Sequence, residues 1–372
     1  MSLKLKQLWC VCSICFLFTG CWDSHEILSL GFVDGVAIEY REAKNIRLIL
    51  QVAQPSSDKT SAKYLNVSQI GPTIVAALHR ATYYSNKLLN FTHVHTILMN
   101  EELGKSKDFT KILDAFLKNN EFNRTAYMVF TQSSSEKILE NRNSDISTPA
   151  VSLATLIQQA HDSLNTPAII TLGEFSKRML NHSSFLIPRI NVSNRKNTLI
   201  GSSVISGEKQ QLIGWLTPTE TQTVTLLTGA KYKSGLPLYI NYHGSPIIYQ
   251  VDNVNVNISS QLHHNQLSFY LDLKLRGKLV ENWTTYQQFD LKFLKSLEKK
   301  INTHVKNKVQ ALIFKMQKEL HTDIGDFSRV ARTQQYPIWE KHKQNWDEYF
   351  TQVPIKVKVT SKVQKFSVQD KQ

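Results

Sequence analysis

The thiol of Cys21 is the one side chain near the start of this sequence whose neighbours suggest covalent chemistry. It follows Phe18-Thr19-Gly20, which has the form of a bacterial lipobox. In a lipobox the cysteine takes an S-diacylglyceryl group, the peptide is cut just before it, and the freed amine takes an N-acyl chain such as palmitate. Lipoboxes usually have leucine three places before the cysteine, where this chain has Phe18. We therefore predict lipidation of Cys21 after a cut between Gly20 and Cys21. An ordinary signal peptide with a cysteine there by chance is the alternative.

The residues before Cys21 have the pattern of an export signal. Lys4 and Lys6 form a short basic start, and Leu8 to Phe18 is an almost unbroken apolar run. A basic region, an apolar region and small residues at the cut site are typical of a secretory signal peptide. The run is shorter than the roughly 20 residues that span a bilayer, so we predict a cleaved leader over residues 1–20.

The cysteine positions support a lipid role for Cys21. The chain has four cysteines, Cys10, Cys12, Cys15 and Cys21, and the first three lie in the predicted leader. Exported domains often use paired cysteines as crosslinks, but after the cut only Cys21 remains. Two or three acyl chains hold a protein firmly at a membrane, whereas one holds it reversibly. We expect a body that is soluble without lipid, tied by Cys21 to the outer face of a membrane.

Other candidate sites carry weaker signals. No G-x-S-x-G elbow, P-loop, G-x-G-x-x-G or set of penicillin-binding motifs is present. His93 and His95 share a face of an expected strand and could bind a metal, but no acidic residue has a recognisable ligand spacing to them. An ordinary half-buried pair is the simpler interpretation. His263 and His264 are expected in a loop.

Two features near the C-terminus could also be functional. Asp323 and Asp326 could form an acid pair, although the turn that ends a helix explains them more simply. Trp339, Trp346 and Phe350 could stack on sugars, but their helical spacing favours core packing. We predict no catalytic residues, no metal and no cofactor, and the sequence identifies no ligand-binding residues.

Composition is that of a globular protein, with an uneven charge distribution. Hydrophobic residues make up 41%, charged residues 20%, and the net charge is +14. From Lys292 to Gln372 there are 17 basic and 8 acidic residues. Because we expect the protein to be exported, we expect no nucleic-acid partner. The basic residues could instead bind anionic lipid or an acidic partner, or they could simply face solvent. Lys356, Lys358 and Lys362 should share the polar face of a strand.

Strands and helices are expected to alternate in the first half of the chain. The predicted strands are Leu30–Tyr40, Asn45–Ala53, His93–Met99, Thr125–Thr131, Phe185–Val192, Asn197–Ser206 and Leu212–Leu216. The predicted helices are Gly71–Tyr84, one from Ser106 or Asp108, Ser134–Glu140, Thr148–Leu164, one from Thr171, and one from Thr217 to Gly229. A polar loop is expected over Pro55–Lys63. Thr217-Pro218-Thr219-Glu220 is the best helix start, with an N-cap, a first-turn proline and a capping-box glutamate.

The second half reads as a sheet followed by a long helix. The pattern from Leu238 to Glu281 is β-like, and a helix is predicted over residues 286–321 with one apolar stripe. A shorter helix is predicted over Pro337–Phe350, and a final strand over Pro354–Phe366. We predict an α/β (α+β) fold with mixed sheets, flanking helices and the long helix packed on a sheet. The expected domains are 21–145 (α/β), 146–196 (helical and linking) and 197–372 (α+β).

Several stretches resemble the Ger(x)C family, the spore germination lipoproteins that form the C subunits of germinant receptors. Cys21-Trp22-Asp23 with His25-Glu26-Ile27 is similar to the family's C-W-D-x-x-E-I opening. Later similarities, spread over essentially the whole mature chain, are Gly31–Glu39, Gly71–Leu139, Ile187-Pro188, Gly201, Gly214-Trp215-Leu216, Gln317–Asp323, Tyr336-Pro337, Trp339, Asn345-Trp346 and Phe350. The family commonly has G-x-G after the aspartate matching Asp323. Here Gly325 is one place early and Ser328 replaces the second glycine, which puts the local turn in doubt.

The resemblance implies a non-enzymatic lipoprotein on the outer face of the spore inner membrane. It implies assembly with integral-membrane A and B subunits, and a three-domain α/β body of unusual fold. Small germinants would be recognised mainly by the membrane subunits, and this chain would interact with them only indirectly. The alternatives are the solute-binding lipoprotein of an importer, which needs two similar lobes, and a wall hydrolase, which needs a carboxylate pair or metal site.

Overall fold

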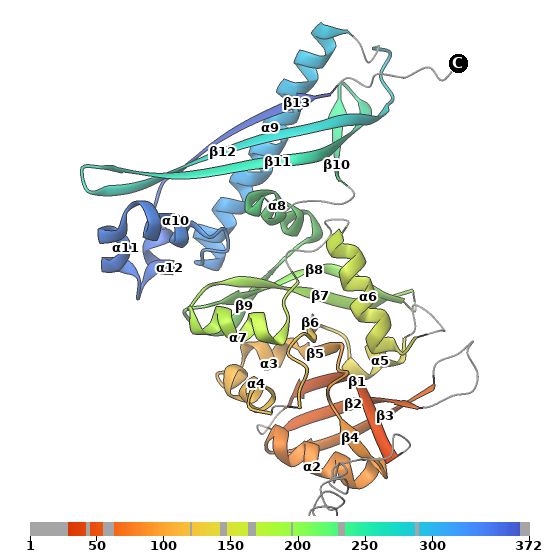
Figure 1. Ribbon diagram of the computed structural model, residues 1–372. Coiled ribbons are helices and arrows are strands. Elements are labelled where there is room, and N and C mark those ends of the chain that lie inside the picture. Colours follow the sequence, from red (N-terminus) through yellow and green to blue (C-terminus); the bar gives the residue numbers. More distant parts are fainter. Residues whose placement is uncertain are drawn as a thin grey trace, which may run out of the picture.

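Two mixed β-sheets, one after the other along the chain, form the body of the protein (Figure 1). The computed structural model describes residues 29–41, 45–54, 63–119, 121–141, 147–162, 169–194, 196–229, 235–286 and 290–364. The first sheet uses residues 30–216 and the second uses residues 236–363. The fold is therefore mixed α/β with a long C-terminal helix on a sheet, as predicted.

The first sheet has strand order β3-β2-β1-β5-β6-β7-β8-β9, with β4 also paired to β1. Its strands are β1 Leu30–Tyr40, β2 Ile46–Gln54, β3 Lys63–Gly71, β4 Leu88–Asn90, β5 Thr96–Asn100, β6 Tyr127–Thr131, β7 Phe185–Ser193, β8 Lys196–Ser206 and β9 Gln211–Leu216. Its helices are α2 Ile74–Ser85, α3 Glu101–Lys105, α4 Phe109–Leu117, α5 Ser135–Glu140, α6 Pro149–Asp162 and α7 Leu172–Leu180. The expected domain boundaries near residues 145 and 196 both fall within this sheet, so the division into domains stays a prediction.

Helices cover both faces of the first sheet, and successive strand residues alternate between two cores. On β5, Ile97 and Met99 lie in the core that also holds residues of α2, α4 and α7. Leu98, between them, lies in the core with residues of α5 and α6. Side chains of a strand point alternately to opposite faces, so apolar residues at successive positions require cover on both sides.

The second sheet has order β10-β11-β12-β13 and is covered on one face by the long helix α9 (Figure 1). Its elements and those around it are α8 Pro218–Thr228, β10 Leu236–Tyr242, β11 Ser245–His263, β12 Gln266–Asn282, α9 Leu291–Lys315, a π-helical turn Met316–Leu320, α10 Phe327–Gln334, α11 Tyr336–His342, α12 Trp346–Phe350 and β13 Ile355–Val363. The predicted stripe of α9, from Phe293 through Leu297 and Ile301 to Leu312, is buried. β13 runs parallel to β12.

The two sheets share an apolar core at their junction. Leu186, Val204 and Leu216 of the first sheet belong to the cluster formed by α8, α9 and the second sheet. α8 begins as predicted: the Thr217 hydroxyl accepts from the Glu220 amide and the Glu220 carboxylate accepts from the Thr217 amide. Glu220 also binds Lys315 of α9 at 2.9 Å, so one carboxylate caps α8 and links it to α9.

Several elements differ from the prediction, and the short elements β4, α3 and α10 were not predicted. The strand β3 was not predicted. It lies at the edge of the sheet, where Leu65 and Ile70 are exposed, so apolar and polar residues do not alternate clearly along it. α9 starts at Leu291 instead of Tyr286, because Asp290 accepts from the amides of Lys292 and Phe293 and so fixes the first turn.

The single helix predicted over residues 337–350 is wrong. It is divided into α11 and α12 by residues 343–345. Asn345 has φ −129° and ψ 37°, outside the helical region. The change of direction lets Trp346 and Phe350 enter the core, while α11 buries no residue.

Candidate functional site

The predicted lipidation site lies outside the described residues. The cut between Gly20 and Cys21, and the leader before it, therefore stay predictions. The structure does describe where the chain joins the body: β1 begins at Leu30, beside Leu88 of β4. No helix among the described residues is long and apolar enough to cross a membrane.

His93 and His95 lie just before β5, and both are exposed. The structure places Asp34 of β1 near both, which the sequence did not indicate because the aspartate is about 60 positions earlier. Burial raises the pKa of Asp34, while a hydrogen bond from the Thr148 hydroxyl at 2.7 Å and the two imidazoles oppose that rise. Among the described residues there is no cluster of three or more potential metal ligands. The expected half-buried pair on a strand is wrong, because both histidines are exposed and β5 begins only at Thr96.

His263 and His264 lie at the tip of the β11–β12 hairpin. His264 and Asn265 have φ of 48° and 64°, as a two-residue hairpin turn of type I′ requires. The two imidazoles stack with their centroids 4.2 Å apart. The predicted loop position is confirmed for His264, whereas His263 is the last residue of β11.

Asp323 is a buried acceptor at the centre of a turn. Its Oδ1 accepts from the amides of Gly325 and Phe327, both at 3.1 Å. Its Oδ2 accepts from the Ser328 amide at 2.6 Å and from Trp346 Nε1 at 3.0 Å. The turn thus forms with the glycine one place early and serine at position 328. Burial raises the pKa of Asp323 to about 6.

Asp326 does not form an acid pair with Asp323. It has φ 64° and binds the exposed Arg329. The nearby acidic residue is instead Asp347, whose Oδ1 accepts from the Asp323 amide at 3.0 Å. Its Oδ2 accepts from the Thr322 hydroxyl at 2.8 Å, and Thr322 shares a 2.7 Å hydrogen bond with Ser184, just before β7. These contacts join the C-terminal helices to the first sheet.

The aromatic cluster belongs largely to the core. Trp346 and Phe350 are buried. The side-chain nitrogen Nε2 of Gln317 donates to the Phe350 carbonyl at 2.9 Å. Trp339 is half-buried, with the Arg332 guanidinium 5.0 Å from its ring and its Nε1 donating to Ser328 at 3.2 Å. The residues that carried the later part of the family resemblance therefore hold together α10, α11, α12 and the end of α9.

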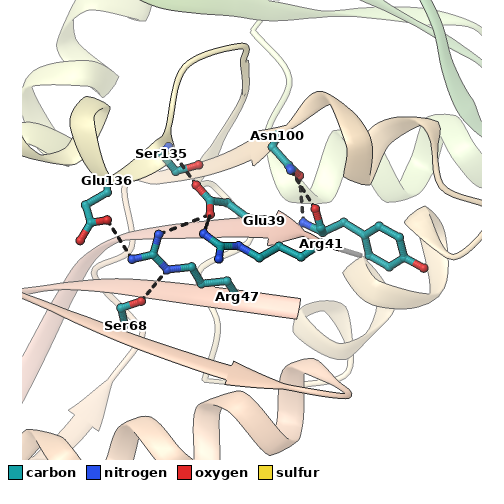
Figure 2. A network of polar contacts seen from close by, with 8 residues as sticks. Glu39, Arg41, Arg47, Ser68, Asn100, Ser135 and Glu136 are labelled. Atoms are coloured by element: carbon teal, nitrogen blue, oxygen red, sulfur yellow. Dashed lines mark hydrogen bonds and ion pairs between the residues drawn. The ribbon is translucent and has the colours of Figure 1, made fainter. Parts of the chain in front are cut away.

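An arginine-lined hollow lies at one edge of the first sheet. It has a volume of about 510 Å³ and is lined by Arg41, Arg47, Ser68, Gln69, Ile70 and Arg80. Figure 2 shows the network behind it, in which Arg47 donates to Ser68 and Glu136, both at 2.8 Å, and lies 3.6 Å from Glu39. These contacts tie β1, β2 and β3 to α5.

The remaining arginines of the hollow are less constrained than Arg47. The Arg41 side chain is half exposed and donates to Glu39 at 3.2 Å. Arg80, on α2, donates to the Ile70 carbonyl at 2.5 Å. Three of its lining residues are arginines, so the hollow can attract an anion.

The basic C-terminal residues lie on the strand β13 and on the helix α9. Lys356, Lys358 and Lys362 are exposed on the outer face of β13 and neighbour Lys274 and Arg276 of β12. The inner residues of β13 pack toward α9: the Ser361 hydroxyl donates to the Glu298 carbonyl at 3.2 Å. Most lysines of α9 are exposed, whereas Lys315 is half-buried and binds Glu220 of α8.

Comparison with known proteins identifies relatives over nearly the whole chain. A family model described as "Spore germination protein N-terminal domain" matches residues 23–192, and one described as "Spore germination B3/ GerAC like, C-terminal" matches residues 200–367. Spore germination protein YndF of Bacillus subtilis (strain 168) is 24% identical over 98% of both chains. Spore germination protein B3 of the same strain is 25% identical over 93% of this chain and 94% of its own.

A solved structure shows the same fold. The crystal structure of the GerBC protein matches with a TM-score of 0.62 and 22% identity, covering 91% of this chain and 100% of that chain. Together with the two family models, this confirms the resemblance read from Cys21-Trp22-Asp23 and the C-terminal aromatic residues. The chain belongs to the spore germination family whose domains are described as B3/GerAC-like.

Proposed function

We propose that this chain is the lipid-anchored C subunit of a spore germinant receptor, held by Cys21 on the outer face of the spore inner membrane. The observation that carries the proposal is the order of features along the chain. The family match begins at residue 23, immediately after a lipobox that leaves Cys21 as the first residue. A germination protein whose body starts at a lipidated cysteine would act at the membrane surface, where integral-membrane A and B subunits would assemble with it.

A non-enzymatic role is part of this proposal. Two buried or half-buried acidic residues have structural partners: Asp323 accepts four N–H groups, and Asp347 binds Thr322 and the Asp323 amide. Occupied acceptors of this kind are poorly placed to exchange protons with a substrate. Germinants would accordingly reach this subunit only indirectly, through the membrane subunits.

The solute-binding alternative is less favoured by the architecture. That class would need two similar lobes around a ligand cleft. Here one sheet has nine strands and the other four, with different strand orders, and their shared apolar core fills the junction. The junction is therefore packed as a structural contact.

The proposal is tested by Cys21→Ala in a sporulating host. We expect an uncut or unanchored protein, and spores that respond poorly to the receptor's germinant. Cys15→Ala is the matched control, because it removes a leader cysteine six places before the lipobox cysteine and should change neither property. If a Cys21→Ala chain without its leader stayed at the membrane in cells lacking the A and B subunits, the lipid anchor would be refuted.

A further inference from the structure

The outward face of α2 carries an unusual number of exposed apolar and aromatic side chains. Tyr83 is 73% exposed, Tyr84 70%, Val75 65%, and Leu88, just after the helix, 48%. His79 lies on the same face, with its ring 5.1 Å from that of Tyr83. We call this set the α2 surface: Val75, His79, Tyr83, Tyr84 and Leu88. Tyrosine combines an apolar ring with a polar tip and is enriched where protein meets the membrane–water interface.

The α2 surface lies beside the point where the chain enters the body. Leu30, the first residue of β1, pairs with Leu88. A Cβ atom placed on Gly31 would lie 3.3 Å from the Cβ of Lys87. An extended chain spans at most about 3.6 Å per residue, so the eight steps from Cys21 to Ser29 reach at most about 29 Å. A lipid on Cys21 would therefore hold this end of the molecule near the bilayer, and α2 lies at the end opposite the second sheet (Figure 1).

The charge around α2 suits an anionic surface. The sequence contains no aspartate or glutamate between Lys59 and Asn100. Arg80 and Lys87 belong to or directly follow α2, and Arg80 also lines the hollow that contains Arg41. Each lysine or arginine near an anionic membrane adds to its electrostatic attraction. Exposed aromatic side chains beside cations, with no nearby acidic residue in the sequence, match the chemistry of an interface rich in phosphate.

We propose that the α2 surface is a membrane-contact surface, which rests against anionic phospholipid headgroups when the chain is anchored. Tyr83, Tyr84 and Leu88 enter the interface, while Arg80 and Lys87 face the lipid phosphates. This inference rests on the proposed lipid anchor at Cys21, which brings the surface to the bilayer, and it adds an orientation. The first sheet faces the membrane, and the basic outer face of the second sheet is held away from it.

Fluorescence quenching in reconstituted vesicles tests this orientation. The mature chain has no cysteine other than the lipidated Cys21, so a single introduced thiol can be labelled. The lipidated chain carrying His79→Cys is labelled with an environment-sensitive fluorophore and placed in phosphatidylcholine–phosphatidylglycerol vesicles with nitroxide-labelled headgroups. The matched control is Asn257→Cys, exposed on β11 of the second sheet.

We expect quenching at position 79 to exceed quenching at position 257 several-fold. Adding Tyr83→Ser, Tyr84→Ser and Leu88→Ser should bring it close to the level at position 257. Adding Tyr239→Ser, a substitution of a similarly exposed tyrosine on β10, should leave it unchanged. Circular dichroism of each variant checks that the chain is folded.

The possible failures are distinguishable. A chain that does not float with the vesicles would refute the lipid anchor and this inference with it. A chain that floats but shows equal, weak quenching at both positions would refute the orientation alone. Quenching at position 79 that required added receptor membrane subunits would assign the α2 surface to a protein partner and would also overturn the proposal.

Discussion

Asp323→Asn should destabilise the C-terminal half of the protein even though the change is nearly isosteric. The carboxylate accepts four N–H groups, two on each oxygen. The amide of asparagine offers one oxygen, which can keep the bonds to Gly325 and Phe327. Its NH₂ group would then face two donors, the Ser328 amide and the Trp346 indole, so two buried N–H groups would lose their acceptor.

The size of the effect follows from those two donors. A buried polar group left without a partner costs about 1–3 kcal/mol. The neutral amide recovers part of the cost of burying the Asp323 charge. We therefore expect a net loss of about 2–4 kcal/mol in the free energy of unfolding, a large part of the roughly 5–15 kcal/mol that stabilises a typical domain.

A double-mutant cycle with Trp346→Phe assigns the loss to the hydrogen bonds. The phenyl ring has no N–H, so Asp323→Asn should cost about 1–3 kcal/mol less in that background. A chain beginning at Trp22 can be unfolded in urea and followed by tryptophan fluorescence. Because the two sheets can unfold separately, hydrogen exchange at the Ser328 amide gives the local value.

The reasoning would be refuted by an Asp323→Asn protein as stable as the parent, with the Ser328 amide equally protected. A loss that was the same in the parent and Trp346→Phe backgrounds would show that the indole bond is not part of the effect. Glu348→Gln on α12 is the control for a charge change alone, since it removes an acidic side chain outside the Asp323 turn and should cost little.

Three further predictions concern the same half of the chain. Burial raises the pKa of Asp323 from 3.8 to about 6, so between these pH values the folded state holds a proton that the unfolded state has released. From pH 7 to pH 5 the free energy of unfolding should therefore rise by about 1 kcal/mol more in the parent than in Asp323→Asn. Asp326 has φ 64°, so Asp326→Gly should leave the free energy of unfolding unchanged or raise it by up to about 1 kcal/mol, whereas Asp326→Val should lower it, as measured by urea unfolding. A lipid-free body has no anchor to orient it, so its exposed Lys356, Lys358 and Lys362 can reach anionic vesicles that the anchored chain would hold away from them. Charge reversal of these three residues to glutamate should weaken that binding at low salt, and the difference should vanish as salt shortens the screening length below about 8–10 Å; equal binding at all salt concentrations would contradict it.

Local chemistry explains which parts of the fold could be predicted. The start of α8 was predicted correctly because the hydroxyl of Thr217 and the carboxylate of Glu220 satisfy backbone groups within the same turn. The stripe of α9 was also correct, since its spacing of three and four residues fixes one buried face. Strand β3 was missed because an edge strand buries little, and its exposed Leu65 and Ile70 obscure the alternation.

Contacts between distant residues explain what the sequence could not supply. Asp323 was considered with Asp326 because they are close in sequence, but its partner is Trp346, and no spacing rule connects the two. The approach of Asp34 to His93 and His95 depends on the parallel pairing of β1 with β5. The α2 surface is likewise visible only after the other faces of the helix are seen to be buried. The predicted lipidation of Cys21 lies outside the described residues and depends on experiment.

The position of β13 has a consequence for how the protein is made. Ile355 pairs with Phe269, 86 positions earlier in the chain, so this edge of β12 stays unpaired until residues 355–363 have been synthesised. Such distant pairing forms slowly, because a long loop must close before any contact is gained. Until then β12 presents an unpaired edge to other chains. A premature stop codon before residue 355 would therefore produce a chain with an exposed β12 edge, which is expected to aggregate.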